Sequence, residues 1–299
     1  MKYILYIPSP VKKMEIEIEE NEFNELEKAK EFLHFIVNHE ESYDIIISNY
    51  IEFEQEILQL TLQNVMYHDS TSSSFYELRM RLNKRLINLL TSVKLYQDLG
   101  IHQIPKYLTE RVKYQTEIKK FFSNEYDNKN HYRFMEELRK YTQHAGLAIH
   151  LTSFSMSRAN SQNSSQLEYS VNFSSYSEQL KKDKMFNGSK FPKMEEEIDL
   201  KLAVRHYIES VSFVHSSVRE LFKNFTNDSR NKLESAHTKF KEEFKCDTNY
   251  LRATGIDRKS NVKDISILLD WDDVRIILQH KNKRLTKLSD GYITSMSKV

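Results

Sequence analysis

Glycine, proline and cysteine are scarce in this sequence of 299 residues, and long apolar runs are missing. Five glycines and four prolines exclude a collagen-like or low-complexity disordered chain. The single cysteine, Cys246, excludes an intrachain disulfide and a cysteine-rich zinc site, and we expect a cytoplasmic protein. Because no run of about 18 apolar residues occurs, we expect no transmembrane helix and no membrane partner.

Common phosphate-binding and zinc-binding motifs are also missing. Neither GxxxxGK[ST] nor GxGxxG occurs, which excludes the usual nucleotide-binding loops, and neither HExxH nor paired CxxC occurs. The stretch 1–13 has an apolar segment too short for a signal peptide, interrupted by Pro8 and Pro10. We therefore expect a protein without a secretion signal, a bound metal or a cofactor.

Charged and apolar side chains are abundant. Hydrophobic residues make up 39% of the chain and charged residues 29%, which is typical of a folded protein of one large or two smaller domains. Residues 1–69 carry 5 basic and 15 acidic side chains, a charge of −10, and the remainder carries 39 and 28, a charge of +11. A basic body can attract phosphate chains; solvated helix faces with internal charge pairing are the alternative.

The spacing of apolar residues predicts mainly α-helices. Apolar residues recur every three or four positions in 24–39 and 50–68. The next helix is expected to begin at Ser74, where Glu77 completes a capping box, and to end before Gly100.

Two shorter helices follow, and residues 41–146 are expected to form a four-helix up-and-down bundle with short connections. Two more helices are expected at about 194–224 and 228–246. Residues 265–284 are compatible with one helix or with two strands joined at Asp272–Asp273.

Strict alternation of apolar and polar residues predicts β structure in two places. Residues 1–20 contain two such stretches, which can pair as a hairpin. After Gly146 the period changes from helical to alternating, and residues 147–175 are expected to form a β-hairpin with a bulge at Thr152–Ser153.

The predicted fold class is therefore mainly α, an up-and-down helical bundle with a β-hairpin after its last helix and short β segments at the termini. The expected organisation has an N-terminal β segment at 1–20, a helical bundle at 21–150, the β-hairpin at 147–175, and a C-terminal helical region with a possible terminal β segment at 190–299.

An arginine and a histidine mark the end of the last bundle helix. In the stretch "LRKYTQHAG", Arg139 precedes His144 by five positions. The alternating pattern typical of a β-strand begins after Gly146. Two other Arg/His pairs have similar offsets, and of these Arg230 and His237 are the second candidate, because a helix turns them in nearly the same direction.

Arginine and histidine at this spacing and place resemble the signature of the HEPN superfamily, and the resemblance covers roughly residues 41–150. It implies a HEPN-like helical bundle and a metal-independent endoribonuclease that needs no cofactor. His144 would transfer protons, and Arg139 would stabilise charge on the phosphate as the ribose 2′-OH attacks it. Lys140 and Gln143 would contact the RNA.

The resemblance also implies partners and a biological role. A homodimer is expected, with Arg139 and His144 of both copies near the two-fold axis. RNA would be the substrate, an inhibitory or activating protein partner is possible, and the protein would act as an RNA-cleaving toxin or an antiphage abortive-infection effector.

A structural interpretation of the same pair competes with the catalytic one. Arg139 can pair with Glu136 one turn earlier, and His144 suits a helix C-terminus when protonated. Lys140 stands where HEPN motifs commonly carry Asn, Asp or His, and an ideal helix separates positions five apart by about 140°. The alternative function is a non-catalytic helical RNA- or protein-binding regulatory module.

Overall fold

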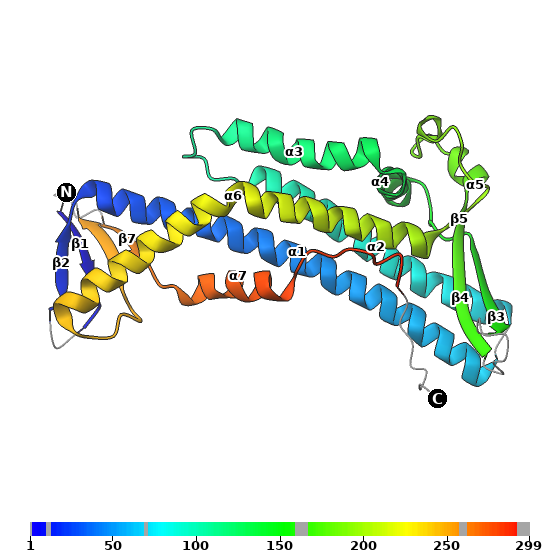
Figure 1. Cartoon of the computed structure of the whole chain (residues 1–299), viewed down its shortest axis with the longest axis horizontal. Coiled ribbons are helices and arrows are strands. Elements are labelled where there is room, and N and C mark those ends of the chain that lie inside the picture. Colours follow the sequence, from blue (N-terminus) through cyan, green and yellow to red (C-terminus); the bar gives the residue numbers. More distant parts are fainter. Residues whose placement is uncertain (1, 10–12, 69–70, 159–166, 257–261, 292–299) are drawn as a thin grey trace. The chain divides into compact units, whose positions relative to one another are not determined.

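The computed structural model describes residues 2–9, 13–68, 71–158, 167–256 and 262–291. Helices dominate these residues, which confirms the mainly α fold class (Figure 1). The helices are α1 (Glu20–Tyr67), α2 (Ser72–His102), α3 (Arg111–Asn128), α4 (Asn130–His144), α5 (Ser177–Lys181), α6 (Leu200–Phe244) and α7 (Asp270–Lys281), with a short 3-10 helix at Gly188–Lys190. The strands are β1 (Lys2–Tyr6), β2 (Glu15–Ile18), β3 (Leu151–Arg158), β4 (Leu167–Tyr176), β5 (Glu197–Asp199), β6 (Arg252–Ile256) and β7 (Val262–Ser266).

The chain divides into two compact units, each assembled from separate stretches of sequence. Unit 1 comprises Met1–Ser42, Leu99–Ile118 and Ser217–Lys283, and unit 2 comprises Tyr43–Asp98, Lys119–Ser216 and Arg284–Val299. Helices α1, α2, α3 and α6 contribute residues to both units. Each unit has a hydrophobic core of its own.

Unit 1 contains a four-stranded antiparallel sheet with the order β2-β1-β6-β7. The N-terminal hairpin predicted within residues 1–20 is confirmed, since β1 and β2 pair with Tyr3 opposite Ile18. β1 also pairs with β6, which comes from the other end of the chain. Gly255 of β6 faces Tyr3, and a Cβ at that position would lie 2.6 Å from the Tyr3 ring, so the sheet requires glycine here.

Unit 2 has the larger core, to which α1, α2, α4 and α6 all contribute, and a sheet with the order β3-β4-β5. The β-hairpin predicted at 147–175 is confirmed, although its loop at 159–166 lies outside the described residues. The predicted bulge at Thr152–Ser153 is wrong. Pairing runs without interruption from Leu151 opposite Ser174 to Arg158, because the strand begins only at Leu151 and residues 147–149 precede it.

Two helices are longer than the sequence pattern indicates. The helical stretches at 24–39 and 50–68 belong to one helix, α1, because the buried side chains of Tyr43 and Ile46 continue its apolar stripe. The break expected between 194–224 and 228–246 is also wrong. In α6 the buried Thr226 and Ser229 keep the stripe unbroken through the polar stretch, since packing overrides local propensity.

The predicted limits of α2 are wrong at both ends. The helix begins at Ser72, and Thr71 rather than Ser74 caps it, since Thr71 Oγ1 accepts the backbone N–H of Ser74 at 3.2 Å. Gly100 does not end the helix, which continues to His102. A Cβ at Gly100 would lie 3.2 Å from the His39 ring, so this glycine allows close packing of the helix.

The ambiguous stretch at 265–284 forms mainly a helix, α7, which β7 precedes. Three aspartates in its first turn favour the helix at the positive end of its dipole. None of the helices in the described ranges combines the length and apolar character that crossing a bilayer requires.

Candidate functional site

Arg139 lies on the buried side of α4 and is only 8% exposed. Its Nε and Nη2 atoms both lie 3.4 Å from Glu136 Oε2, and its Nη1 donates to Gln143 Oε1 at 3.0 Å. His144 is exposed in the last turn of α4. Within the part of the chain that the structure describes, no hydrogen bond or ion pair joins Arg139 to His144. Arg139 thus has the partner that the structural interpretation predicts.

Lys140, the other residue predicted to contact RNA, also has an acidic partner. Its Nζ donates to Glu137 Oε1 at 2.9 Å, and the Glu137 carboxylate is almost fully buried. Lys190 approaches the same oxygen at 3.1 Å, so Glu137 connects α4 to the segment that follows α5.

The second candidate pair, Arg230 and His237, joins α6 to neighbouring segments of unit 1. Arg230 forms ion pairs with Asp272 and Asp273 of α7, each at 3.0 Å. His237 uses both ring nitrogens, since Nδ1 lies 2.9 Å from Thr248 Oγ1 and Nε2 lies 2.8 Å from the carbonyl oxygen of Ile267. Neither histidine nitrogen is left for a substrate.

A buried polar network fixes α4 against α6 within unit 2. The Tyr207 hydroxyl of α6 donates to Glu136 Oε1 at 2.6 Å, and Gln97 of α2 donates to the same oxygen at 2.9 Å. Tyr132 of α4 accepts a second hydrogen bond from Gln97 at 3.1 Å, and its ring lies 5.1 Å from that of Tyr207. Tyr132 and Tyr207 are both almost fully buried, so their positions are well determined by packing.

Each of these two tyrosines follows a histidine, and the histidines meet at the surface. His131 precedes Tyr132 in α4, and His206 precedes Tyr207 in α6. Their imidazole rings stack, with centroids 4.4 Å apart and planes 17° apart. The buried tyrosine pair and its network therefore place two histidines from distant parts of the sequence side by side.

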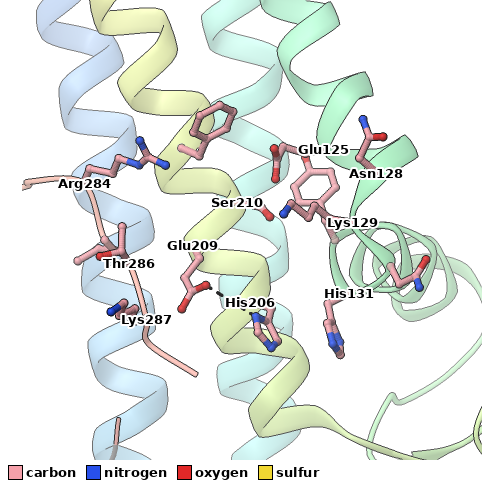
Figure 2. A pocket seen from close by; sticks show the side chains of 14 residues that line it. Glu125, Asn128, Lys129, His131, His206, Glu209, Ser210, Arg284, Thr286 and Lys287 are labelled. Carbon is pink, nitrogen blue, oxygen red and sulfur yellow. Dashed lines mark ion pairs between the residues drawn. The ribbon is translucent and has the colours of Figure 1, made fainter. Parts of the chain in front are cut away.

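The stacked histidines lie at the wall of the cavity shown in Figure 2, whose volume is about 560 Å³. One wall is the face of α6 that carries His206, Glu209, Ser210 and Phe213, which recur at helical spacing. Opposite lie the end of α3 and the first turn of α4, and residues 284–287 complete the cavity. A cavity of this size can hold a small organic ligand or one nucleotide.

Three basic side chains reach this cavity from two parts of the chain. Lys129 joins α3 to α4, while Arg284 and Lys287 come from the segment after α7. Arg284 lies over the Phe213 ring, with 4.9 Å from Cζ to the ring centroid. Among the described residues, no acidic side chain forms an ion pair with Lys129, Arg284 or Lys287. Their charge is available to an anionic ligand.

Two carboxylates moderate that positive charge. Glu125 is buried in the cavity wall, and Glu209 Oε2 lies 3.7 Å from His206 Nδ1 (Figure 2). The first turn of α4 lines the cavity without a side-chain cap, so the positive end of a helix dipole adds to the three cations. With both histidines neutral, the side chains that line the cavity comprise three cations and two carboxylates, a net charge of +1. Protonation of either histidine would raise this net positive charge.

His206 influences the protonation of His131. His131 is exposed as a whole, but desolvation by the protein around its ring lowers the pKa of His131 below its ordinary value of 6.5. A protonated His206 lowers it further by charge repulsion, and Glu195 acts in the opposite direction. His131 is therefore neutral at neutral pH and can accept a proton.

The described ranges contain no group of three or more His, Cys, Asp or Glu side chains placed to hold a metal ion. In the cavity itself, two histidines and two carboxylates stand among three cations, and cations disfavour a bound metal ion. The arrangement suits an anion and proton transfer.

Motif analysis missed His131 and His206 because they are 75 positions apart and belong to different helices. One local signal exists. The dipeptide His-Tyr occurs at 131–132 and again at 206–207, each time with the tyrosine on the apolar face of a helix. Two histidines beside two core tyrosines on neighbouring helices can lie at a common surface.

Comparisons of the chain with protein-family models, with curated proteins and with solved structures give no match. They assign no family to the chain.

Proposed function

We propose that the protein is a metal-independent endoribonuclease that cleaves RNA in the cavity of His131 and His206. The observation that carries the proposal is the stacking of these two imidazoles at 4.4 Å beside three basic side chains that have no acidic partner among the described residues. Two histidines can supply a base and an acid, and cations stabilise the charge that develops on a phosphate.

In the proposed reaction one histidine is the base and the other is the acid. Neutral His131 accepts the proton of the ribose 2′-OH, whose oxygen attacks the adjacent phosphorus. Protonated His206 donates a proton to the departing 5′-oxygen, and Lys129, Arg284 and Lys287 stabilise the phosphorane charge. The P–O5′ bond breaks as the O2′–P bond forms, which leaves a 2′,3′-cyclic phosphate and a 5′-hydroxyl.

This site differs from the Arg139/His144 site in its dependence on a second copy. The cavity is formed within unit 2 of a single chain, so specific activity should not change with protein concentration. A site made from Arg139 and His144 of two copies near a two-fold axis would lose specific activity on dilution below the dissociation constant of the dimer.

The test is cleavage of an end-labelled single-stranded RNA in EDTA, with analysis of the product ends. His131→Ala and His206→Ala should each lower the rate by about a hundredfold or more. His144→Ala is the matched control, because it removes an exposed histidine from α4 without touching the cavity. Cleavage that His144→Ala abolishes and His131→Ala leaves intact would overturn the assignment in favour of the motif pair.

The alternative function is a non-catalytic RNA- or protein-binding regulatory module, and the same three cations favour it for RNA. Such a module would bind labelled RNA without cleaving it. Binding that Lys129→Ala and Arg284→Ala weaken, combined with intact RNA after incubation, would establish the module instead of the enzyme.

A further inference from the structure

Residues 284–290, which we call the strap, have no regular secondary structure, yet they complete the cavity. Two backbone N–H groups attach the strap to α6. The backbone N–H of Leu285 donates to Ser212 Oγ at 2.8 Å, and the backbone N–H of Ser289 donates to Glu209 Oε1 at 3.1 Å. A turn at Lys287, with φ of 59°, brings Ser289 back toward the helix.

The Glu209 carboxylate serves two neighbours at once. Oε1 accepts the N–H of Ser289, while Oε2 faces His206 Nδ1 at 3.7 Å (Figure 2). The Glu209 side chain is only 23% exposed, so it has limited freedom to turn away. The strap therefore fixes one carboxylate oxygen, and the position of the other follows from it.

We propose that Glu209 is a positioning residue for His206 and that the strap holds it in place. A carboxylate facing Nδ1 favours the ring form with its proton on that atom. Nε2 is then the nitrogen that exchanges a proton with a ligand in the cavity. The inference deepens the proposed function, since it states which nitrogen of His206 serves as the proton donor.

The other charged groups around His206 do not replace Glu209 in this role. His131 stacks on the ring from α4 and can only repel a protonated His206. Lys129, Arg284 and Lys287 are cations, and Glu125 lies across the cavity on α3. Among the described residues, Glu209 is the carboxylate that lies within ion-pair distance of His206, at 3.7 Å from Nδ1.

The strap also determines the charge of the cavity. Arg284 and Lys287 both belong to it, so a detached strap would remove two of the three cations and free the Glu209 side chain. The same short segment thus supplies the anion-binding groups and sets the orientation of the proton donor.

Two variants distinguish the effect of the Glu209 charge from the effect of the hydrogen bond that the strap donates to Glu209. Glu209→Gln keeps the oxygen that accepts the Ser289 N–H and removes the negative charge. Ser289→Pro removes that N–H and leaves Glu209 intact. Ser289→Ala is the matched control, because it keeps the backbone donor and loses only a hydroxyl contact of 3.5 Å.

The primary readout is the tautomer of neutral His206, from ¹⁵N shifts of the imidazole in the full-length protein. Wild type and Ser289→Ala should show the proton mainly on Nδ1, and both Glu209→Gln and Ser289→Pro should shift it toward Nε2. In RNA cleavage, Glu209→Gln should lower kcat about tenfold with little change in KM.

An Nε2–H ring in the wild type, or an unchanged tautomer in Glu209→Gln, would overturn the inference. The NMR readout does not depend on cleavage. A wild-type ring with its proton on Nδ1, in a protein that cleaves no RNA, would support the positioning role of Glu209 and overturn the proposed ribonuclease function.

Discussion

Replacing Arg139 with methionine tests whether this residue stabilises the fold. The Arg139 and Glu136 side chains are 10% and 9% exposed, and their charged atoms lie 3.4 Å apart. At an effective dielectric constant of about 20, such a pair attracts by about 5 kcal/mol, part of which offsets the desolvation of both groups. Glu136 keeps its hydrogen bonds from Tyr207 and Gln97, so we expect Arg139→Met to lower the unfolding free energy by about 2–3 kcal/mol.

A double-mutant cycle with Glu136→Gln isolates the charge interaction. The amide retains an oxygen for Tyr207 but no charge, so Arg139→Met should cost less in that background, with a coupling energy of about 1–2 kcal/mol. Urea unfolding followed by circular dichroism measures all four variants. Lys182→Met breaks an exposed ion pair and should change stability little. A coupling energy near zero would refute the structural role of Arg139.

Three further predictions concern pH, the second Arg/His pair and salt. His150 accepts the Tyr176 N–H at 3.0 Å, and burial lowers its pKa below 6.5, so its protonation favours the unfolded chain. The unfolding free energy should therefore fall between about pH 7.5 and pH 5.5, and His150→Asn should flatten this dependence in urea titrations. His237→Ala should lower the unfolding free energy by about 1–2 kcal/mol through its lost hydrogen bonds, without slowing RNA cleavage, as unfolding and cleavage assays will show. Arg284→Gln should reduce the slope of log affinity for single-stranded RNA against log salt by about 0.7 in fluorescence anisotropy, and an unchanged slope would contradict phosphate contact at the strap.

Local periodicity predicts most of the helices and both hairpins, because side-chain burial repeats within a few residues. It cannot predict where an element ends when distant packing decides. Gly100 has the features of a helix terminator, but its missing side chain accommodates the ring of His39. Asn227 and Asp228 disfavour a helix locally, and α6 continues through them because the buried Phe222 and Leu233 lie on one stripe.

The pairing of strands that are distant in the sequence also cannot be predicted from the local pattern of apolar residues. The predicted N-terminal β segment exists, but β6 lies outside the stretch at 265–284 that is compatible with strands, and the pairing of β1 with β6 follows from tertiary structure. Gly255 must be a glycine because the Tyr3 ring lies against it, and this contact exists only once the two strands have paired. A single sequence gives alternation within each strand and no register between them.

The residues of the candidate site also come together through tertiary packing, which spacing along the sequence does not predict. Spacing along one helix indicates the Arg139/His144 motif, whereas His131 and His206 meet because α4 packs on α6. That packing depends on Glu136, which binds Tyr207 directly and Arg139 through an ion pair. Loss of Arg139 would therefore disturb Tyr207, which follows His206 in α6, and would slow cleavage without any contact between Arg139 and RNA. Only a variant that retains full stability and loses cleavage identifies a catalytic group, and the exposed His131 and His144 are the two residues at which that comparison is decisive.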